Sequence, residues 1–261
     1  MTDFNEYLII NKKAWDKRTP IHLQSKFYKN NEFKNGKTSL NSIELDAIGN
    51  VEGKSLLHLQ CHFGQDSISF GRMGARVTGV DFSDVAISLA RKLSKETKVH
   101  VDFVEGDVLK LNLEKKFDII FSSYGVLGWI PELNKWANTI SNHLKKGGLF
   151  LLTEFHPFVE LIKDNGYDYF YSEIPDVEIE NGTYTDGGEN LITKTCWWNH
   201  SLTDIFTALE SNNLKLTFFE EFDYSPYKLE DMIEKEKGKY VLKKRINNST
   251  PYVFNLKATK K

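Results

Sequence analysis

The chain has 261 residues, 40% of them hydrophobic and 27% charged, so it can bury one large core and has the composition of an ordinary globular protein. Its formal net charge of −2 excludes a general attraction to nucleic acid or to anionic membranes. We find no signal-peptide pattern and no apolar run near the ~20 residues of a membrane-spanning helix. From the two cysteines, Cys61 and Cys196, we expect no disulfide framework and a reducing, cytoplasmic environment.

The N-terminal part of the chain reads as helical. Apolar residues at helical spacing predict a helix over residues 3–18, which Thr19-Pro20 is expected to end. An aromatic yet polar stretch follows, and a short helix is predicted over residues 42–48. We assign residues 1–50 to an N-terminal helical arm.

The stretch from 54 to 90 organises the rest of the chain. An apolar run at 55–59 predicts a buried parallel strand, residues 60–64 (QCHFG) form a tight turn, and a helix and a second strand follow. Asp81 closes that second strand. This order is that of the nucleotide-binding half of a doubly wound sheet. There, backbone amides and a helix N-terminus bind the ligand, and the acid accepts bonds from ribose hydroxyls.

The sequence LLHLQCHFGQD at residues 56–66 resembles motif I of the class I S-adenosylmethionine-dependent methyltransferases, in the form that a subgroup of small bacterial members has. The usual motif is a strand followed by D/E-x-G-x-G-x-G, whose fixed positions fall here on His58, Gln60, His62 and Gly64. Only the last glycine is kept, so Gln60 and His62 must point away from the ligand or supply side-chain donors. An ordinary strand, turn and helix without a ligand is the alternative.

The resemblance implies an α/β fold: a doubly wound, Rossmann-like seven-stranded sheet with a terminal antiparallel hairpin and helices on both faces. It also implies S-adenosyl-L-methionine as the cofactor. In the family an acid after the third strand bonds adenine, and Asp107 matches that position, although Gly106-Asp107 is also an ordinary turn signal. The cofactor-binding residues implied in this way are Tyr28, Gln60, His62, Gly64, Asp66, Asp81, Phe82, Asp107, Val108 and Ser123.

Segments ahead of motif I often fold over the cofactor in this family, which implies that the arm is a lid. Tyr28, with Arg18 or His22, would then contact the cofactor's carboxylate or the substrate. A packed arm with a solvated basic face is the alternative.

A fourth strand is predicted over residues 117–123 and a fifth over 149–153, and residues 51–154 form the cofactor-binding core. Ligands of open α/β sheets bind beyond the carboxyl ends of the strands, so Tyr124 and Trp129 are candidates for the site. Trp129 has the alternative role of anchoring the start of a helix.

His156 follows the fifth strand, and an imidazole with an ordinary pKa near ~6.5 suits proton transfer. A histidine held structurally ahead of Pro157 is the alternative. We name His156 and Tyr124 as the catalytic candidates.

Residues 155–200 are expected to be an inserted, substrate-side subdomain containing two strands, 177–180 and 191–198. Trp129 and Trp197 are the substrate-contact candidates. The subdomain's aromatic residues would wall a small apolar pocket or form a dimer face. They are Tyr167, Tyr169, Phe170, Tyr171, Tyr184, Trp197 and Trp198.

Residues 201–261 are predicted to hold a helix capped by Ser201 and the terminal strand hairpin. The basic stretch 235–245 is interpreted as a solvated loop, because a nucleic-acid site would need a larger basic surface. A nicotinamide dehydrogenase would usually continue here with parallel βαβ units.

Together these features predict methyl transfer from S-adenosylmethionine to an oxygen or nitrogen of a small, partly apolar molecule by a monomer or homodimer. We expect no metal, no nucleic-acid partner and no membrane partner. Two alternatives stay open. One is a nucleotide- or NAD(P)-binding Rossmann enzyme, and the other is a non-catalytic binding protein with the methyltransferase fold.

Overall fold

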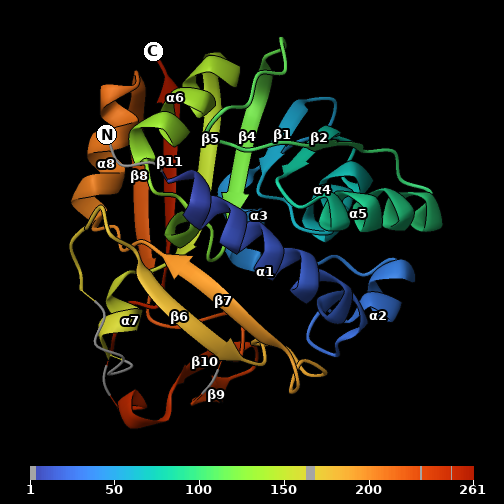
Figure 1. The fold of residues 1–261 in the computed structure, drawn as a ribbon. Helices are drawn as coiled ribbons and strands as arrows, with labels where there is room; N and C mark the ends of the chain where they lie inside the picture. The colour runs from blue at the N-terminus through green and yellow to red at the C-terminus, as the bar shows by residue number, and fades with distance from the viewer. Residues whose placement is uncertain (1–3, 163–167, 230, 248) are drawn as a thin grey trace.

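The computed structural model describes residues 4–162, 168–229, 231–247 and 249–261, so Tyr167 of the predicted aromatic set lies outside the described residues. A seven-stranded sheet in the order β3-β2-β1-β4-β5-β11-β8 forms the centre of the molecule (Figure 1). The strands are β1 (Ser55–Leu59), β2 (Arg76–Asp81), β3 (Asp102–Glu105), β4 (Phe117–Ser123), β5 (Leu144–Phe155), β8 (Leu214–Phe222) and β11 (Val253–Lys260).

The strand directions confirm the expected doubly wound fold with a terminal hairpin. Strands β1 to β5 pair in parallel, whereas β11 pairs antiparallel with both β5 and β8. All five parallel strands therefore end at one edge of the sheet, which is the edge where ligands of such sheets bind.

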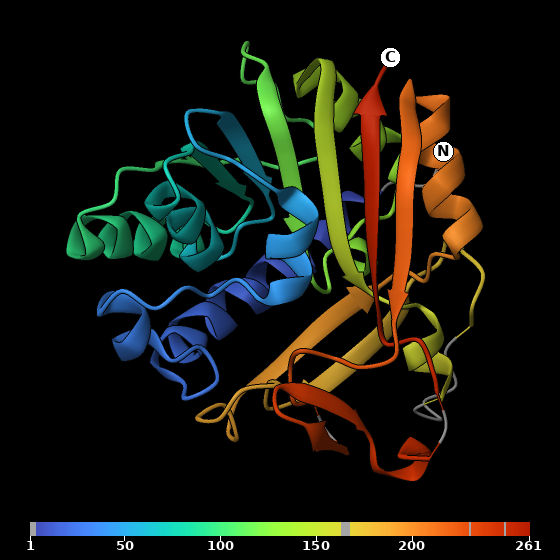
Figure 2. The ribbon, with the colours of Figure 1, turned by 180° about the vertical axis from the view of Figure 1, so that it is seen from behind.

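Helices cover both faces of the sheet (Figure 2). They are α1 (Asn5–Gln24), α2 (Asn30–Lys34), α3 (Ser42–Ile48), α4 (Gln65–Arg72), α5 (Asp84–Thr97), α6 (Leu133–His143), α7 (Phe158–Ile162) and α8 (Leu202–Ser211), with the 3-10 turns η1 (Leu127–Trp129) and η2 (Lys243–Arg245). Neighbouring strand residues serve opposite faces. Leu57 packs with α6 and α8, and Leu56 packs with α2 to α5. Among the described residues, no helix is both long and apolar enough to cross a bilayer.

Three boundaries differ from the sequence prediction. α1 does not end at Thr19-Pro20 but continues to Gln24. It packs against β7 and α5 and buries Arg18 and His22, and these contacts outweigh the backbone bond that proline cannot make. The third strand, for which the apolar run predicts residues 99–104, starts at residue 102, and β5 begins at residue 144 rather than at residue 149.

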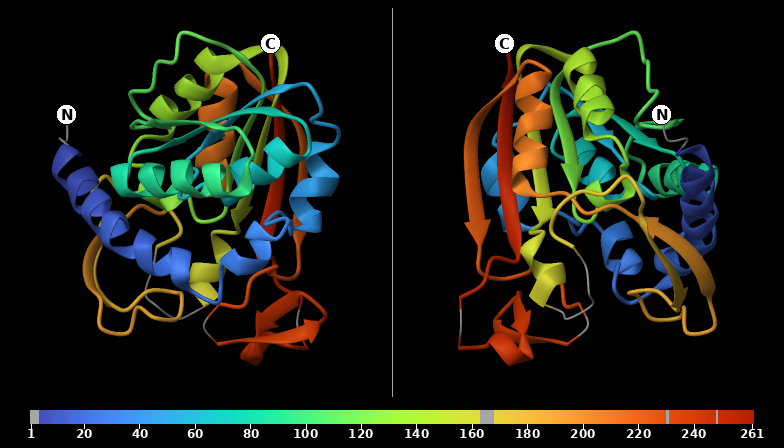
Figure 3. Two further views of the ribbon diagram at one scale, coloured as in Figure 1. Left: turned by 90° about the vertical axis from the view of Figure 1, so that its right-hand side faces the viewer. Right: turned by 60° about the vertical axis from the view of Figure 1, so that its left-hand side comes forward.

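Two small hairpins lie beyond the carboxyl edge of the sheet (Figure 3). β6 (Asp176–Asn181) and β7 (Ile192–Trp197) pair antiparallel as predicted, and β7 packs along α1. β9 (Met232–Glu236) and β10 (Lys239–Leu242) form the second hairpin, so the prediction of a loop over 235–245 was wrong. The buried side chains of Met232, Val241 and Leu242 pack against β11 and stabilise it.

Gly64 is the one glycine kept at the fixed positions of motif I, and it packs closely against Phe103. Its φ is 81°, and a Cβ built there would lie 2.4 Å from the ring of Phe103. Gly64→Ala is therefore expected to lower the free energy of unfolding by about 1–3 kcal/mol through overpacking. Denaturant unfolding measures this loss. Gly53→Ala is the matched control, because Gly53 has a φ of 70° and open space around it. Equal losses in the two variants would refute the contact with Phe103.

Candidate active site

The motif I turn, residues 60–64, holds three left-handed residues: Gln60 at φ 55°, His62 at φ 51° and Gly64 at φ 81°. Such conformations in non-glycine residues cost energy and cluster at functional sites. Gln60 Nε2 donates to Val126 O at 2.9 Å. Its Oε1 is buried and has no partner among the residues that the structure describes. The turn therefore presents one buried acceptor, Gln60 Oε1, that has no hydrogen-bond partner among those residues.

Asp81 at the end of β2 is 8% exposed and supports the turn. Its Oδ2 accepts from His62 N at 2.8 Å, and its Oδ1 accepts from Ser83 N at 3.0 Å. Burial raises the pKa of Asp81 to about 6, and these backbone bonds act in the opposite direction. The carboxylate thus ties together the two segments that flank the edge of the sheet.

The ends of β2 and β3 lie side by side, because Gly106 N donates to Asp81 O at 2.9 Å. The structure therefore places Asp107 and Val108 on the same edge as Asp81 and Phe82. Asp107 Oδ1 accepts from Leu109 N at 2.9 Å, which closes the turn after β3. Asp81 and Phe82, predicted to contact the cofactor, therefore lie next to Asp107 and Val108, which are predicted to contact it as well.

The N-terminal arm lies over this edge. Thr19 Oγ1 is 3.3 Å from His62 Nε2, and Ser83 Oγ donates to Asp16 Oδ1 at 2.6 Å. The Trp15 ring meets the His62 ring at 5.3 Å in an edge-on contact. Burial lowers the pKa of His62 well below its usual value, with nearby His22 contributing, so this imidazole stays neutral.

A second group of predicted residues gathers beside the turn. Ser123 Oγ donates to Asp66 Oδ2 at 3.4 Å, and Ser39 Oγ donates to Asp66 Oδ1 at 2.5 Å. Burial raises the pKa of Asp66, and the two serine bonds oppose that shift. Tyr28 is hydrogen-bonded to the residue before Asp66, because its carbonyl oxygen accepts from Gln65 Nε2 at 3.1 Å.

Sequence reasoning missed Glu44 and Tyr227. The Tyr124 hydroxyl donates to Glu44 Oε2 at 3.0 Å, and the Tyr124 and Tyr227 rings meet edge-on at 5.0 Å. The only local signal at Glu44 is its capping box with Asn41, which reads as a helix start rather than as a site. Tyr227 lies in a loop with no recognisable pattern.

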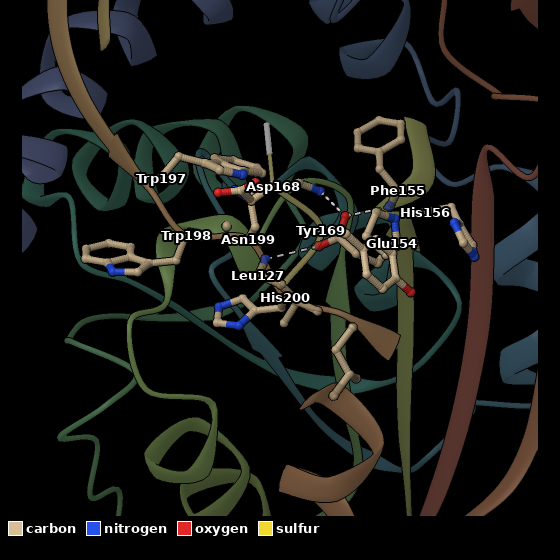
Figure 4. Close-up of a pocket in the computed structure, with 14 residues that line it drawn as sticks. Leu127, Glu154, Phe155, His156, Asp168, Tyr169, Trp197, Trp198, Asn199 and His200 are labelled. Atoms are coloured by element: carbon tan, nitrogen blue, oxygen red, sulfur yellow. Dashed lines mark hydrogen bonds between the residues drawn. The ribbon is translucent and has the colours of Figure 1, made fainter. Parts of the chain in front are cut away.

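A pocket of about 70 Å³ lies between the loop after β4, the end of β5 and the segment after β7 (Figure 4). Glu154, which sequence reasoning also missed, organises this loop. It accepts from the backbone nitrogens of Gly125, of Val126 at 2.8 Å and of Leu127 at 3.1 Å. Burial raises the pKa of Glu154, and these bonds counter the shift.

His156 also lines this pocket, but its two ring nitrogens already have neighbours. Nδ1 accepts from Phe158 N at 3.1 Å, and Nε2 is 3.0 Å from Glu221 Oε1. In Figure 4 the rings of His156 and His200 lie on opposite sides of Glu154. The two catalytic candidates have different hydrogen-bond partners, because His156 accepts from Phe158 N and Tyr124 donates to Glu44.

The predicted substrate-contact residues pack on each other. The Trp129 and Trp197 rings meet edge-on at 5.0 Å, and Trp15 meets Trp129 at 5.4 Å. A Cβ on Gly128 would lie 2.1 Å from the Trp197 ring, so only glycine allows this approach. This row of indoles connects the arm, the loop after β4 and the inserted hairpin.

Residues 56–148 match the family described as a methyltransferase domain. A demethylmenaquinone methyltransferase from Lactococcus lactis subsp. lactis (strain IL1403) is 31% identical over 135 residues, which cover 49% of this chain and 53% of that protein. A ubiquinone biosynthesis O-methyltransferase from Paramagnetospirillum magneticum is 31% identical over 100 residues, 38% of this chain and 40% of that protein. The chain spans about half the length of the curated relatives it matches.

The likeness in fold extends further along the chain. A crystal structure of an S-adenosylmethionine-dependent methyltransferase from Clostridium acetobutylicum ATCC 824 superposes with a TM-score of 0.60 at 18% identity, covering 95% of this chain and 98% of that one. The one from Mesorhizobium loti gives 0.59 at 18% identity, covering 87% and 100%. The chain thus has the class I S-adenosylmethionine-dependent methyltransferase fold, with a segment that matches the methyltransferase domain family at its centre.

Proposed function

We propose that this protein transfers a methyl group from S-adenosylmethionine to an oxygen or nitrogen of a small molecule. The observation that carries the proposal is the match of residues 56–148 to the methyltransferase domain family. That segment contains the motif I turn and Asp81. The relatives named for demethylmenaquinone and for ubiquinone biosynthesis support a small-molecule acceptor.

The residues at the edge of the sheet fit the cofactor. Gln60 Oε1, buried without a partner among the described residues, would accept from the cofactor's ammonium group. Asp81 would hold the ribose hydroxyls, and Asp107 the adenine amino group. When bound, the cofactor supplies a methyl group already activated on a sulfonium sulfur. Catalysis by the chain is then mainly positioning, worth up to ~7–11 kcal/mol in favourable systems.

The roles of the segments belong to the same proposal. Residues 1–50 act as the lid, residues 51–154 hold the cofactor, and residues 155–200 lie on the acceptor's side. The arm's contacts with His62 and Ser83 support the lid. We also propose that the protein works in the cytoplasm as a monomer or homodimer, with no nucleic-acid partner.

A thermal-shift titration tests the choice of cofactor. S-adenosylhomocysteine at about 100 times its Kd is expected to stabilise the fold by ~2.7 kcal/mol. At ~2–4 °C per kcal/mol this raises the melting temperature by roughly 5–10 °C. NAD(P) serves as the control, because a nicotinamide-binding Rossmann enzyme would respond to it instead. A shift with NAD(P) and none with the adenosyl ligand would falsify the proposal.

A further inference from the structure

We propose that the methyl acceptor is an amine, whose ammonium group binds among four tyrosines, Tyr28, Tyr124, Tyr184 and Tyr227, hereafter the tyrosine cluster. This inference rests on the proposed function and adds the substrate class. The four residues come from the segment between α1 and α2, the end of β4, the β6–β7 loop and the β8–β9 loop. Chain segments so far apart in sequence meet here because tertiary packing brings them together.

The rings of the cluster form walls of the kind that recognise cations. The Tyr28 and Tyr184 hydroxyls are 2.5 Å apart, and the Tyr124 and Tyr227 rings meet edge-on at 5.0 Å. Phe27 joins them, with its ring 5.1 Å from Tyr28 and stacked on Tyr227 at 5.6 Å. Aromatic faces attract ammonium groups through their quadrupoles, and cages of this kind bind alkylated ammonium ligands.

The cluster is reachable from solvent. Tyr184 keeps 48% of its surface exposed, yet burial raises the pKa of its hydroxyl to about 12. Tyr28, Tyr124 and Tyr227 are all half-buried. The amine would approach from the side of Tyr184.

The acids beside the cluster have no basic partner among the residues that the structure describes. Glu44 is fully buried, and its Oε2 accepts from Tyr124. Among the described residues, no lysine or arginine nitrogen lies within 4.0 Å of Glu44 or Asp66. Buried carboxylates normally have a charged partner, because desolvating an unpaired charge is costly. A bound ammonium group would supply that partner.

The other charged and titratable groups that face the cluster do not neutralise its acids. Arg18 lies near Tyr184 but forms an ion pair with Glu180 at 2.7 Å. Burial lowers the pKa of His22 to about 3 and that of His62 well below its usual value, so both rings are neutral. Among the described residues, Glu44 and Asp66 are therefore the acidic groups at the cluster that could pair with a bound cation.

The same contacts provide a path for the proton that an ammonium group must lose before it can attack. That proton passes to Tyr124 Oη as the Tyr124 hydroxyl proton passes to Glu44 Oε2. This leaves a neutral amine and a protonated Glu44. The amine lone pair then forms the N–CH₃ bond while the S–CH₃ bond breaks, and sulfur keeps the electron pair of that bond. Tyr124 touches the substrate, and Glu44 acts through it.

Calorimetric titration with choline, a quaternary ammonium probe, tests the cluster without turnover. The uncharged isostere 3,3-dimethylbutan-1-ol is the matched ligand, and both are titrated in saturating S-adenosylhomocysteine. Choline is expected to bind about tenfold more tightly, within the range of cation–π contacts. Tyr227→Phe keeps the ring and should preserve this preference, whereas Tyr227→Leu should abolish it. Equal binding of the two probes to the wild type would overturn the proposal.

The pH dependence of choline binding tests Glu44. Burial and the neighbouring Asp66 raise the pKa of Glu44 to about 7. Choline affinity should therefore rise between pH 6 and pH 8 as Glu44 ionises, and this rise should be absent in Glu44→Gln. An identical rise in the variant would overturn the role of Glu44. Wild-type protein that binds no S-adenosylhomocysteine would instead count against the proposed function.

Labelled methyl transfer to a metabolite extract gives a direct readout of the product. The labelled products are separated by electrophoresis at pH 7. A labelled methyl group that 13C NMR locates on nitrogen supports an amine acceptor, and one located on oxygen, sulfur or carbon would overturn it while leaving methyl transfer itself intact.

Discussion

Asp81→Ala is expected to weaken the binding of S-adenosylhomocysteine by about ten- to a hundredfold. A carboxylate holding ribose hydroxyls makes charge-assisted bonds worth ~1.5–3 kcal/mol, and alanine removes both oxygens. The variant should also unfold more easily. The backbone nitrogens of His62 and Ser83 lose their acceptor, at ~1–3 kcal/mol for each group left buried and unpaired. Isothermal titration and denaturant unfolding measure the two effects separately.

Glu105→Ala is the matched control for Asp81. Glu105 is the register partner of Asp81 on β3, but its side chain is exposed. Neither affinity nor stability should change in this variant. A folded Asp81→Ala protein that binds the ligand as tightly as the wild type would remove Asp81 from the cofactor site.

Glu44→Gln is expected to stabilise the protein at pH 8 and to flatten its dependence on pH. Burial, with a contribution from Asp66, raises the pKa of Glu44 from 4.5 to about 7 in the folded state. Because the folded pKa is the higher one, the folded protein binds the extra proton between these values. Glu44's contribution to stability is therefore full below the unfolded pKa and is lost as pH rises through about 7. At 1.36 kcal/mol per pKa unit the loss amounts to at most ~3 kcal/mol.

Urea unfolding at several pH values between 2 and 8 checks this, because the contribution of Glu44 changes in the upper part of that range and that of Asp118 in the lower part. Asp118→Asn is a control of opposite sign, because Lys145 and Ser55 hold the pKa of Asp118 below its usual range. Its contribution is lost as pH falls rather than as pH rises. Parallel stability curves for the wild type and Glu44→Gln would contradict the buried charge. A gain in stability from removing it would be typical of a residue kept for function.

Local patterns predicted the sheet well. The apolar runs of β1 and β4 mark strands buried on both faces, and Ser201 caps its helix as expected, through a capping box with Asp204. The position of Asp81 at the end of β2 was predictable because it follows an apolar run in a fixed order of elements. In each of these cases the signal and the structure lie within a few residues of each other.

The tyrosine cluster, the proposed acceptor site, was not predictable in this way. Tyr184 and Tyr227 approach Tyr28 only through tertiary packing of loops, and no spacing along the chain encodes that meeting. Glu44 is the third helical residue of the capping box that Asn41 begins, and its second contact, with Tyr124, left no trace in the sequence. The continuation of α1 beyond Pro20 was unpredictable for the same reason. Burial of the helix against β7 and α5 outweighs the tendency of proline to end a helix.

The contacts of α1 bear on the timing of the reaction cycle. Lys12 pairs with Asp84, Asp16 accepts from Ser83, and Thr19 touches His62, so the helix is fastened on both sides of Asp81. A cofactor bound beside Asp81, as proposed above, would have to wait for these polar contacts to break before it could exchange with solvent. Release of S-adenosylhomocysteine, rather than the methyl transfer itself, would then limit the turnover rate, as product release does in many enzymes that close over their ligands. Because charged contacts exposed to solvent weaken as ionic strength rises, added salt should quicken that exchange.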